Sequence, residues 1–448
     1  MTTRCLPLIP SETSKMADVS LLALALLALI LSAPALIDTK NILRLDVAGG
    51  LLTLTWLLPQ AYALRDDPFS WYYDLSFTYS YIFVCISFLA LGSLIGRRSA
   101  QRRIEHQPIV QNSVMIGHYD PKKLADAAII MAVLGGVAFV LMAREAQNFG
   151  VQDQWTGVIT LYFLLSQFMI FGGALGILLY MQHNNKLGLI AYLAMLAVAT
   201  PVFLFFVRRS VLFQIAAITL GAFALNKNIK VPRVVLAVGL AISVLVLNGA
   251  GAIRYHVIND GGTIVTAFTE GVMFKPNPAG GDVVAAELKS AISDIETARA
   301  TNHYKPFVMI WNTAVSQYVP GFLVGDQTKS SFFLSDESGS LLQSYFAEGA
   351  TRTGFAESFT GYWYFGPLIY FGIGILFGGL WVLTNRKDIR AQLTYLVFLL
   401  YSLLTITESI SRIVVTAPII LMSIWLSFKY AERRPDVIEA DRQVSKPG

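Results

Sequence analysis

Residues 19–36 are VSLLALALLALILSAPAL, a stretch of eighteen positions without a charged side chain. A helix needs about 20 apolar residues to cross the roughly 30 Å hydrocarbon core of a membrane, and it satisfies its backbone hydrogen bonds internally. We therefore expect a membrane-spanning helix here. A cleaved signal peptide is the alternative interpretation, because Arg4 and Lys15 precede the apolar run and small residues end it.

The composition of the whole chain is that of a membrane protein. Of the 448 residues, 55% are hydrophobic and 14% are charged, whereas soluble domains carry roughly 25% charged residues. The mean hydropathy is +0.57. The net charge of +5 comes mainly from short loops, so it indicates orientation in the membrane and not nucleic-acid binding. Two cysteines, Cys5 and Cys85, argue against a disulfide framework and a zinc site.

Hydropathy predicts an all-α polytopic fold with about eleven membrane-spanning helices. The predicted spans are 19–37, 47–64, 76–96, 125–143, 157–182, 188–206, 211–225, 234–250, 362–383, 391–407 and 412–429. They divide the chain into transmembrane helices 1 to 8 (1–250), a large outer loop with short helices (251–361), helices 9 to 11 (362–429) and a tail (430–448).

Positive charges set the predicted orientation. The loop after the third span carries Arg97, Arg98, Arg102 and Arg103, which favours the cytoplasmic side. Alternation from that loop places the N-terminus and residues 251–361 on the outer side, and the C-terminal tail in the cytoplasm.

One arginine pair does not follow this rule. In FLFFVRRSVLF, residues 203–213, Arg208 and Arg209 stand at the outer mouth of a predicted helix hairpin. Charges in hydrocarbon are costly. Two interpretations stay open: the pair reaches outer phosphates or an acid of the large loop, or it meets a negatively charged substrate.

Other charged and aromatic side chains gather on the same side. The candidates for binding an anionic substrate are Arg208, Arg209, Arg254, Lys329, Arg352, Arg412 and Tyr304. The candidates for taking a proton from a hydroxyl are His303, Glu357 and Glu408. Each proton acceptor also has a plain structural interpretation: Glu408 pairs with Arg412 four residues later, His303 is an ordinary loop residue, and Glu357 caps or pairs near the ninth span.

The sequence contains no GxxxxGK[ST] loop, no HExxH, no GxSxG and no CxxC. The spacing of its five histidines suggests no metal site, and no cofactor is predicted.

The second half of the chain is similar to a known family. An arginine opens the outer-to-inner helix VRRSVLFQIAAITLGAFAL, and a large outer loop contains VSQYVPGFLVGDQTKSSFF and ends in TGFAESFTGYWYFGPLIYFGIGILFG. Together these features resemble the O-antigen polymerases, the Wzy-like oligosaccharide repeat unit polymerases. Many members carry a glutamate closer to the tyrosine and the FG pair, at the position where this chain has Thr360.

The resemblance implies a GT-C type glycosyltransferase of the polymerase and ligase branch in a bacterial inner membrane, with a periplasmic N-terminus and large loop. The enzyme would move the growing glycan from undecaprenyl diphosphate to an incoming lipid-linked repeat unit. It would need no metal or cofactor, and a chain-length regulator and a flippase are implied as partners.

Three other interpretations stay open. An O-antigen ligase shares the architecture but passes the glycan to a lipid A core sugar. A transporter or flippase of an anionic lipid-linked substrate would carry charged or broken helices near the membrane midplane. A structural membrane subunit would leave the outer arginines without a role.

Overall fold

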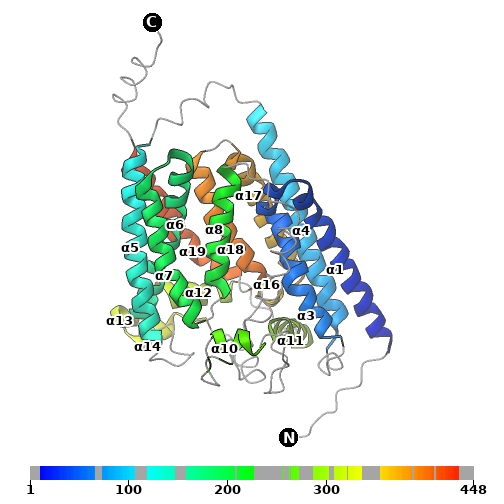
Figure 1. Ribbon diagram of the computed structural model, residues 1–448. Coiled ribbons are helices and arrows are strands. Elements are labelled where there is room, and N and C mark those ends of the chain that lie inside the picture. Colours follow the sequence, from blue (N-terminus) through cyan, green and yellow to red (C-terminus); the bar gives the residue numbers. More distant parts are fainter. Residues whose placement is uncertain are drawn as a thin grey trace.

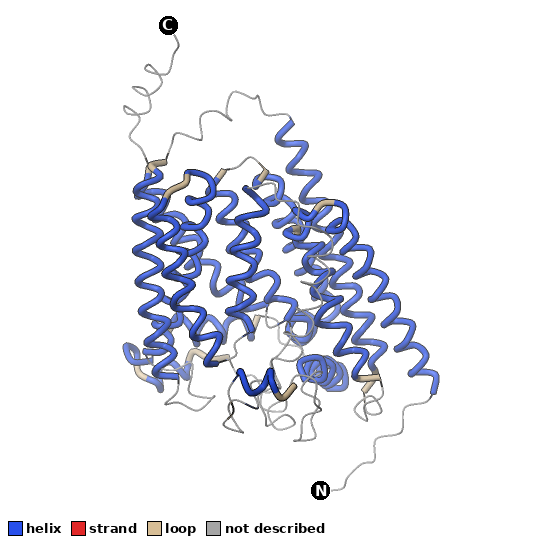
Figure 2. The backbone as a smooth tube through the Cα atoms, in the orientation of Figure 1, coloured by secondary structure: helices blue, strands red, loops and turns tan. Residues whose placement is uncertain are grey.

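The structure is a computed structural model. It describes residues 11–65, 73–105, 119–146, 158–206, 209–226, 256, 262, 264–271, 286–301, 307–319, 321–334, 354–385, 388–407 and 410–432. Within these residues all regular structure is helical (Figures 1 and 2). The elements are α1 Ser11–Ile37, η1 Thr39–Leu43, α2 Leu45–Leu52, η2 Thr53–Leu57, α3 Leu58–Ala63, α4 Leu75–Glu105, α5 Pro121–Ala146, α6 Val158–His183, α7 Lys186–Phe206, α8 Arg209–Asn226, α10 Ile264–Thr269, α11 Ala286–Thr301, α12 Val308–Tyr318, α13 Gly321–Val324, α14 Asp326–Ser331, α16 Gly354–Tyr362, η7 Trp363–Phe365, α17 Gly366–Thr384, α18 Ile389–Thr407 and α19 Ile410–Ala431.

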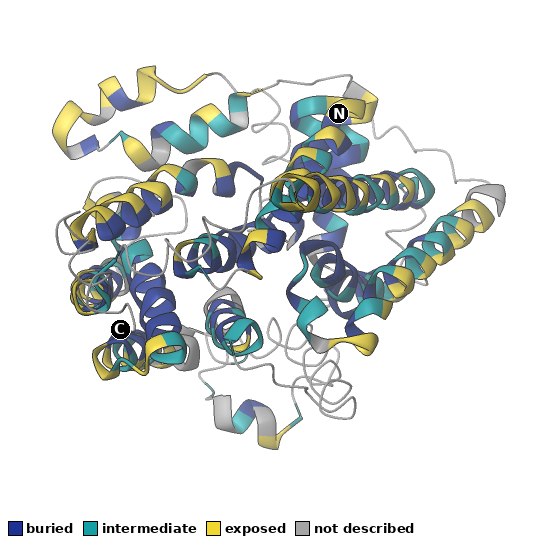
Figure 3. Cartoon of the chain, turned by 90° about the horizontal axis from the view of Figure 1, so that it is seen from above, coloured by how far each residue is buried: buried dark blue, intermediate teal, exposed yellow. Residues whose placement is uncertain are grey.

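The protein is a helical membrane protein. Five described helical segments are long and apolar enough to cross a membrane, namely Lys15–Ile37, Leu75–Glu105, Pro121–Met142, Leu161–His183 and Gly354–Thr384, the last of which comprises α16, the turn η7 and α17. Helical segments also coincide with the other predicted spans except 234–250, which lies outside the described residues. Exposed apolar residues include Leu22 and Ile30 on α1 and Ile130 and Val137 on α5. Figure 3 shows exposed positions in yellow on the helices of the bundle.

The bundle has two distinct ends. Helix α1 begins at the end where α10, α11, α13 and α14 lie, and we call this the outer end after the predicted orientation (Figure 1). Helices α4 and α19 finish at the opposite end, which we call the inner end. The described short helices of the segment 251–361 thus lie at or toward one end of the bundle, and the side of the membrane that this end faces stays a prediction.

A glycine seam joins α4 to α17. An added Cβ on Gly92 or Gly96 would lie 2.2 Å from the carbonyl oxygen of Phe371 or 2.1 Å from that of Ile375. On the facing helix, a Cβ on Gly378 would lie 2.1 Å from the Ser93 carbonyl oxygen. Small residues four positions apart let the backbones of membrane helices approach closely. Close packing is important in lipid, because no hydrophobic effect drives helices together there. This seam fixes α17, and with it α16, on the N-terminal half of the bundle.

Polar side chains connect further helices. The Tyr401 hydroxyl of α18 donates to Gln167 Oε1 of α6, and Gln182 Nε2 of α6 donates to Gln392 Oε1 of α18 at 2.8 Å. Such side chains are costly in hydrocarbon unless they find partners. They hold α18, which precedes α19, against the centre of the bundle.

The predicted span 47–64 is not one regular helix. Residues Thr53–Leu57 form a π-helical turn between α2 and α3, and such turns are often found at functional positions. After this turn, the buried Gln60 side chain accepts the backbone N–H of Leu288 at 3.1 Å. This bond fixes the start of α11, one of the helices of the segment 251–361, on the outer end of the bundle.

Candidate functional site

Glu357 joins two helices at the outer end. It lies in the first turn of α16, is 2% exposed, and directs its carboxylate at the first residues of α19. Its Oε2 accepts the backbone N–H of Ile410 at 2.5 Å, and its Oε1 accepts that of Ser411 at 2.9 Å. The first N–H groups of a helix have no partner within the helix, and negative charge is favourable there. Glu357 therefore caps the last helix of the bundle, not its own helix.

Close helix packing makes this cap possible. A Cβ on Gly354 would lie 1.5 Å from the Thr405 carbonyl oxygen, so only glycine lets α16 approach the end of α18. The Tyr370 hydroxyl donates to the same carbonyl at 3.4 Å. On the other side of α16, the Tyr81 and Ser358 hydroxyls are hydrogen-bonded at 2.8 Å. These contacts from α4, α17 and α18 hold the Glu357 carboxylate in register with the start of α19.

Helix α12 completes this junction. Thr313 Oγ1 donates to Ser411 Oγ at 3.3 Å, so α12 is attached to the second residue of α19. The next residue of α19 is Arg412, a predicted substrate-binding residue, whose side chain is outside the description. The junction therefore places the backbone of Arg412 directly beside the Glu357 cap.

Two other predicted residues are described. Arg209 is the first residue of α8, and the description covers its backbone only. Lys329 lies in α14, is 3% exposed and is engaged within the protein. Buried lysines are nearly always paired, because an isolated ammonium group is expensive away from water.

The remaining predictions fall outside the described residues. They concern Arg208, Arg254, His303, Tyr304, Arg352 and Glu408. The pairing of Glu408 with Arg412 therefore stays a prediction, and so do the roles of the other residues.

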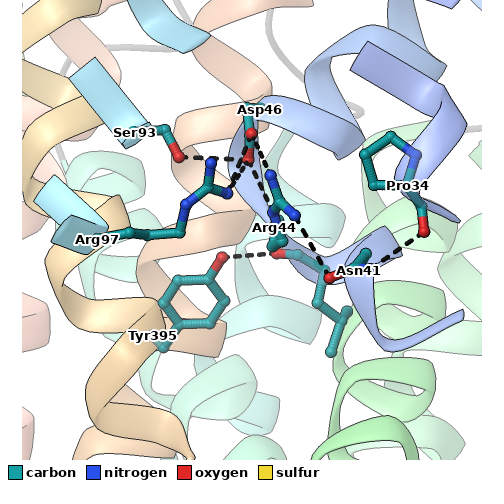
Figure 4. Close-up of polar contacts among 8 residues, drawn as sticks. Pro34, Asn41, Arg44, Asp46, Ser93, Arg97 and Tyr395 are labelled. Atoms are coloured by element: carbon teal, nitrogen blue, oxygen red, sulfur yellow. Dashed lines mark hydrogen bonds and ion pairs between the residues drawn. The ribbon is translucent and has the colours of Figure 1, made fainter. Parts of the chain in front are cut away.

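Figure 4 shows a second charged cluster, around Asp46. The Asp46 carboxylate, 6% exposed, accepts from Arg44 Nη2 at 2.7 Å and from Arg97 Nη1 at 3.1 Å. Ser93 Oγ donates to the same carboxylate at 3.2 Å, and the Tyr395 hydroxyl donates to the Leu43 carbonyl at 2.6 Å. The cluster ties the start of α2 to α4 and α18. Sequence reasoning used Arg97 only to orient the chain and missed this pairing, because the partners are far apart along the chain.

A third cluster fixes α11 on the start of α4. Arg299 Nη1 contacts Asp74 Oδ2 at 3.2 Å and Glu296 Oε1 at 3.1 Å, and its guanidinium lies 4.2 Å from the centroid of the Phe77 ring. Burial alone would raise the pKa of Asp74, but hydrogen bonds from Ser76, Arg299 and the Phe77 N–H outweigh burial and lower it. Burial, opposed by Arg299, raises the pKa of Glu296 above its ordinary value. This cluster was not predicted either.

The described residues contain no group of three or more histidine, cysteine, aspartate or glutamate side chains that would hold a metal ion. Comparisons with family models, curated proteins and solved structures found no match for this chain.

Proposed function

We propose that the protein polymerises oligosaccharide repeat units at the periplasmic face of a bacterial inner membrane. In this proposal it has eleven membrane spans in a GT-C type polymerase and ligase architecture. It transfers the growing glycan from undecaprenyl diphosphate to an incoming lipid-linked unit, working beside a flippase and a chain-length regulator. The family resemblance and the outer arginines support the proposal.

The main structural support for the proposal is the position of two arginines near the starts of helices. At the outer end, α8 begins at Arg209, and α19 has Arg412 as its third residue. Cations are unfavourable at the positive end of a helix, whereas anions are favourable there. At α19 the N–H groups of Ile410 and Ser411 already bind Glu357, so Arg412 itself, and not the helix start, would supply positive charge there. A lipid diphosphate at this membrane face has the charge that these arginines would bind.

The proposed chemistry needs cations and a base. The hydroxyl oxygen of the acceptor sugar bonds to the anomeric carbon of the donor as the bond from that carbon to the diphosphate oxygen breaks. The guanidinium group of arginine can donate two parallel hydrogen bonds to phosphate oxygens. Arg208, Arg209 and Arg254 therefore stabilise the negative charge that develops on the diphosphate leaving group. Arg352, Arg412, Lys329 and Tyr304 are the further candidates for holding the substrate.

The contacts of Glu357 favour a different residue as the base in this proposal. Both oxygens of Glu357 already accept backbone hydrogen bonds, and the residue is buried, so we assign Glu357 a positioning role at the start of α19. The proton of the acceptor hydroxyl then goes to His303 or Glu408.

A reaction of the purified protein with a lipid-linked repeat unit tests the proposal. We expect a ladder of glycan lengths on gels, and we expect Arg209→Ala and Arg412→Ala to shorten or abolish it at normal protein levels. Arg98→Ala, at an exposed position near the inner end, is the matched control and should keep the wild-type ladder. Wild-type ladders from both outer variants would contradict the assigned roles.

Other products would identify the alternatives. Transfer to a lipid A core acceptor without any polymer would indicate a ligase. Movement of the lipid-linked unit across vesicles without a new glycosidic bond would indicate a transporter.

A further inference from the structure

Exposed apolar side chains lie along α13, α14 and the residues that come directly after α14. We define the apolar edge as Trp311, Leu323, Val324, Phe332, Phe333 and Leu334, whose exposed fractions run from 38% at Phe333 to 72% at Leu323. Contiguous apolar surface of this kind is rare on proteins in water and marks a site of contact with a partner or a membrane.

The apolar edge has no exposed charge among its described side chains. The exposed polar residues between its members are the uncharged Gln327, Thr328, Ser330 and Ser331. The cationic Lys329 points into the protein and is 3% exposed. Among the described side chains, this surface is therefore suited to an apolar medium; the side chain of Asp326, the first residue of α14, lies outside the described residues.

Several backbone groups of the apolar edge are hydrogen-bonded within the protein, three of them by side chains of α12. Trp311 Nε1 donates to the Phe332 carbonyl oxygen at 2.8 Å. The side chain of Asn312 makes two hydrogen bonds with the backbone of Leu334. Its Oδ1 accepts the Leu334 N–H at 3.0 Å, and its Nδ2 donates to the Leu334 carbonyl oxygen at 3.1 Å. The N–H of Phe333 donates to the Ser330 carbonyl at 3.3 Å. In lipid, non-helical backbone groups have to find partners within the protein, whereas in water they do not need them.

The edge also lies at the right level. Helix α12 packs against α6 and α19, and its Thr313 is hydrogen-bonded to Ser411 at the start of α19. Figure 1 places α13 and α14 at the level where the helices of the bundle finish at the outer end. In a membrane, the ends of spanning helices lie near the boundary between headgroups and acyl chains, where aromatic side chains such as Trp311 are favoured.

We propose that residues 321–334 dock into the outer leaflet of the membrane, with the apolar edge inserted at the boundary of headgroups and acyl chains. The occupant of this surface is lipid. The segment then acts as an interfacial element beside the spans, in the manner of membrane-surface helices. The inference rests on the geometry of α12 to α14 and holds whatever reaction the protein catalyses.

Spin labelling of the full chain in lipid nanodiscs tests the inference. Cys5→Ser and Cys85→Ala remove the native thiols, and single cysteines then replace Leu323 or Phe333. Val137, an exposed residue of α5, supplies the lipid reference, and Ala300, an exposed residue of α11, supplies the water reference. Collision rates with oxygen, which partitions into lipid, are compared with those of a polar nickel chelate.

We expect labels at 323 and 333 to show an oxygen-to-nickel ratio several-fold above that at 300 and close to that at 137. A ratio equal to that at 300 would overturn the inference. Loss of access to both reagents would also overturn it, because it would indicate a protein partner or a second copy on this surface. Circular dichroism and a single elution peak check that each labelled protein is folded, and both substituted positions are exposed, so the substitutions leave the packing intact.

Discussion

The Glu357 cap gives a stability prediction with a magnitude. Glu357→Ala leaves the buried N–H groups of Ile410 and Ser411 without their acceptor. A hydrogen bond to a charged group contributes ~1.5–3 kcal/mol, so losing both lowers the free energy of unfolding by about 3–6 kcal/mol. Glu357→Gln keeps one acceptor oxygen and turns a donor toward the other N–H, so we expect about half of that loss.

Thiol labelling in mild detergent measures this effect. Cys85 is fully buried, so in a Cys5→Ser background a thiol-reactive dye reports unfolding directly. Titration with dodecyl sulfate then gives the free energy of unfolding for each variant. Gly361→Ala is the matched control on α16, because its new Cβ meets nothing within 4 Å.

The order of the variants decides the test. We expect Gly361→Ala to match the wild type, Glu357→Gln to fall below it, and Glu357→Ala to be the least stable. A Glu357→Ala variant as stable as the wild type would refute the cap. If glutamine kept full stability but abolished glycan polymerisation, the positioning role would be wrong and a catalytic role for the carboxylate would be favoured.

Three further predictions concern the packing and the charged clusters. Gly96→Ala should destabilise the protein by about 1–3 kcal/mol in the same titration through overpacking, whereas Gly372→Ala on α17, with open space around its Cβ, should be neutral or slightly stabilising. Asp46→Ala should cost more stability than Arg98→Ala, because it leaves two guanidinium groups facing each other without their shared carboxylate; equal losses would contradict this pairing. Because the pKa of Asp74 is lowered in the folded state, its contribution is complete above the unfolded pKa of about 4 and is lost as the pH falls through the folded pKa. The difference in melting temperature between wild type and Asp74→Asn should therefore be constant near neutral pH and shrink below about pH 4, and a constant difference down to the lowest pH would count against it.

Most of the membrane helices could be predicted because hydropathy is a local property. The bounds of α6 and α18 differ from the predicted spans 157–182 and 391–407 by only one or two residues. The prediction was less detailed at 47–64, because apolar character does not distinguish an α-helical turn from the π-helical turn at Thr53–Leu57. The predicted ninth span begins at residue 362, whereas α17 begins at Gly366 after the turn Trp363–Phe365, since aromatic residues continue an apolar pattern through a turn.

The site was predictable only as a set of residue types on one side of the membrane. Glu357 is conspicuous in the sequence as an acid near a span, yet its partners at the start of α19 follow from tertiary packing alone. The same holds for Asp46 and Arg97, which belong to different helices. The close approach of α16 to α18 at Gly354 likewise could not be predicted from the sequence, because it depends on the position of α18 in the folded protein.

The glycine seam between α4 and α17 has a consequence for biogenesis. Gly92 and Gly96 belong to the third predicted span and Gly378 to the ninth, so most of the chain is synthesised after α4 leaves the ribosome and before its partner exists. During that interval the face of α4 that carries Gly92 and Gly96 contacts lipid or the insertion machinery. The bundle is completed only when α17 arrives, so a chain truncated before residue 366 loses the partner of α4 as well as its last helices.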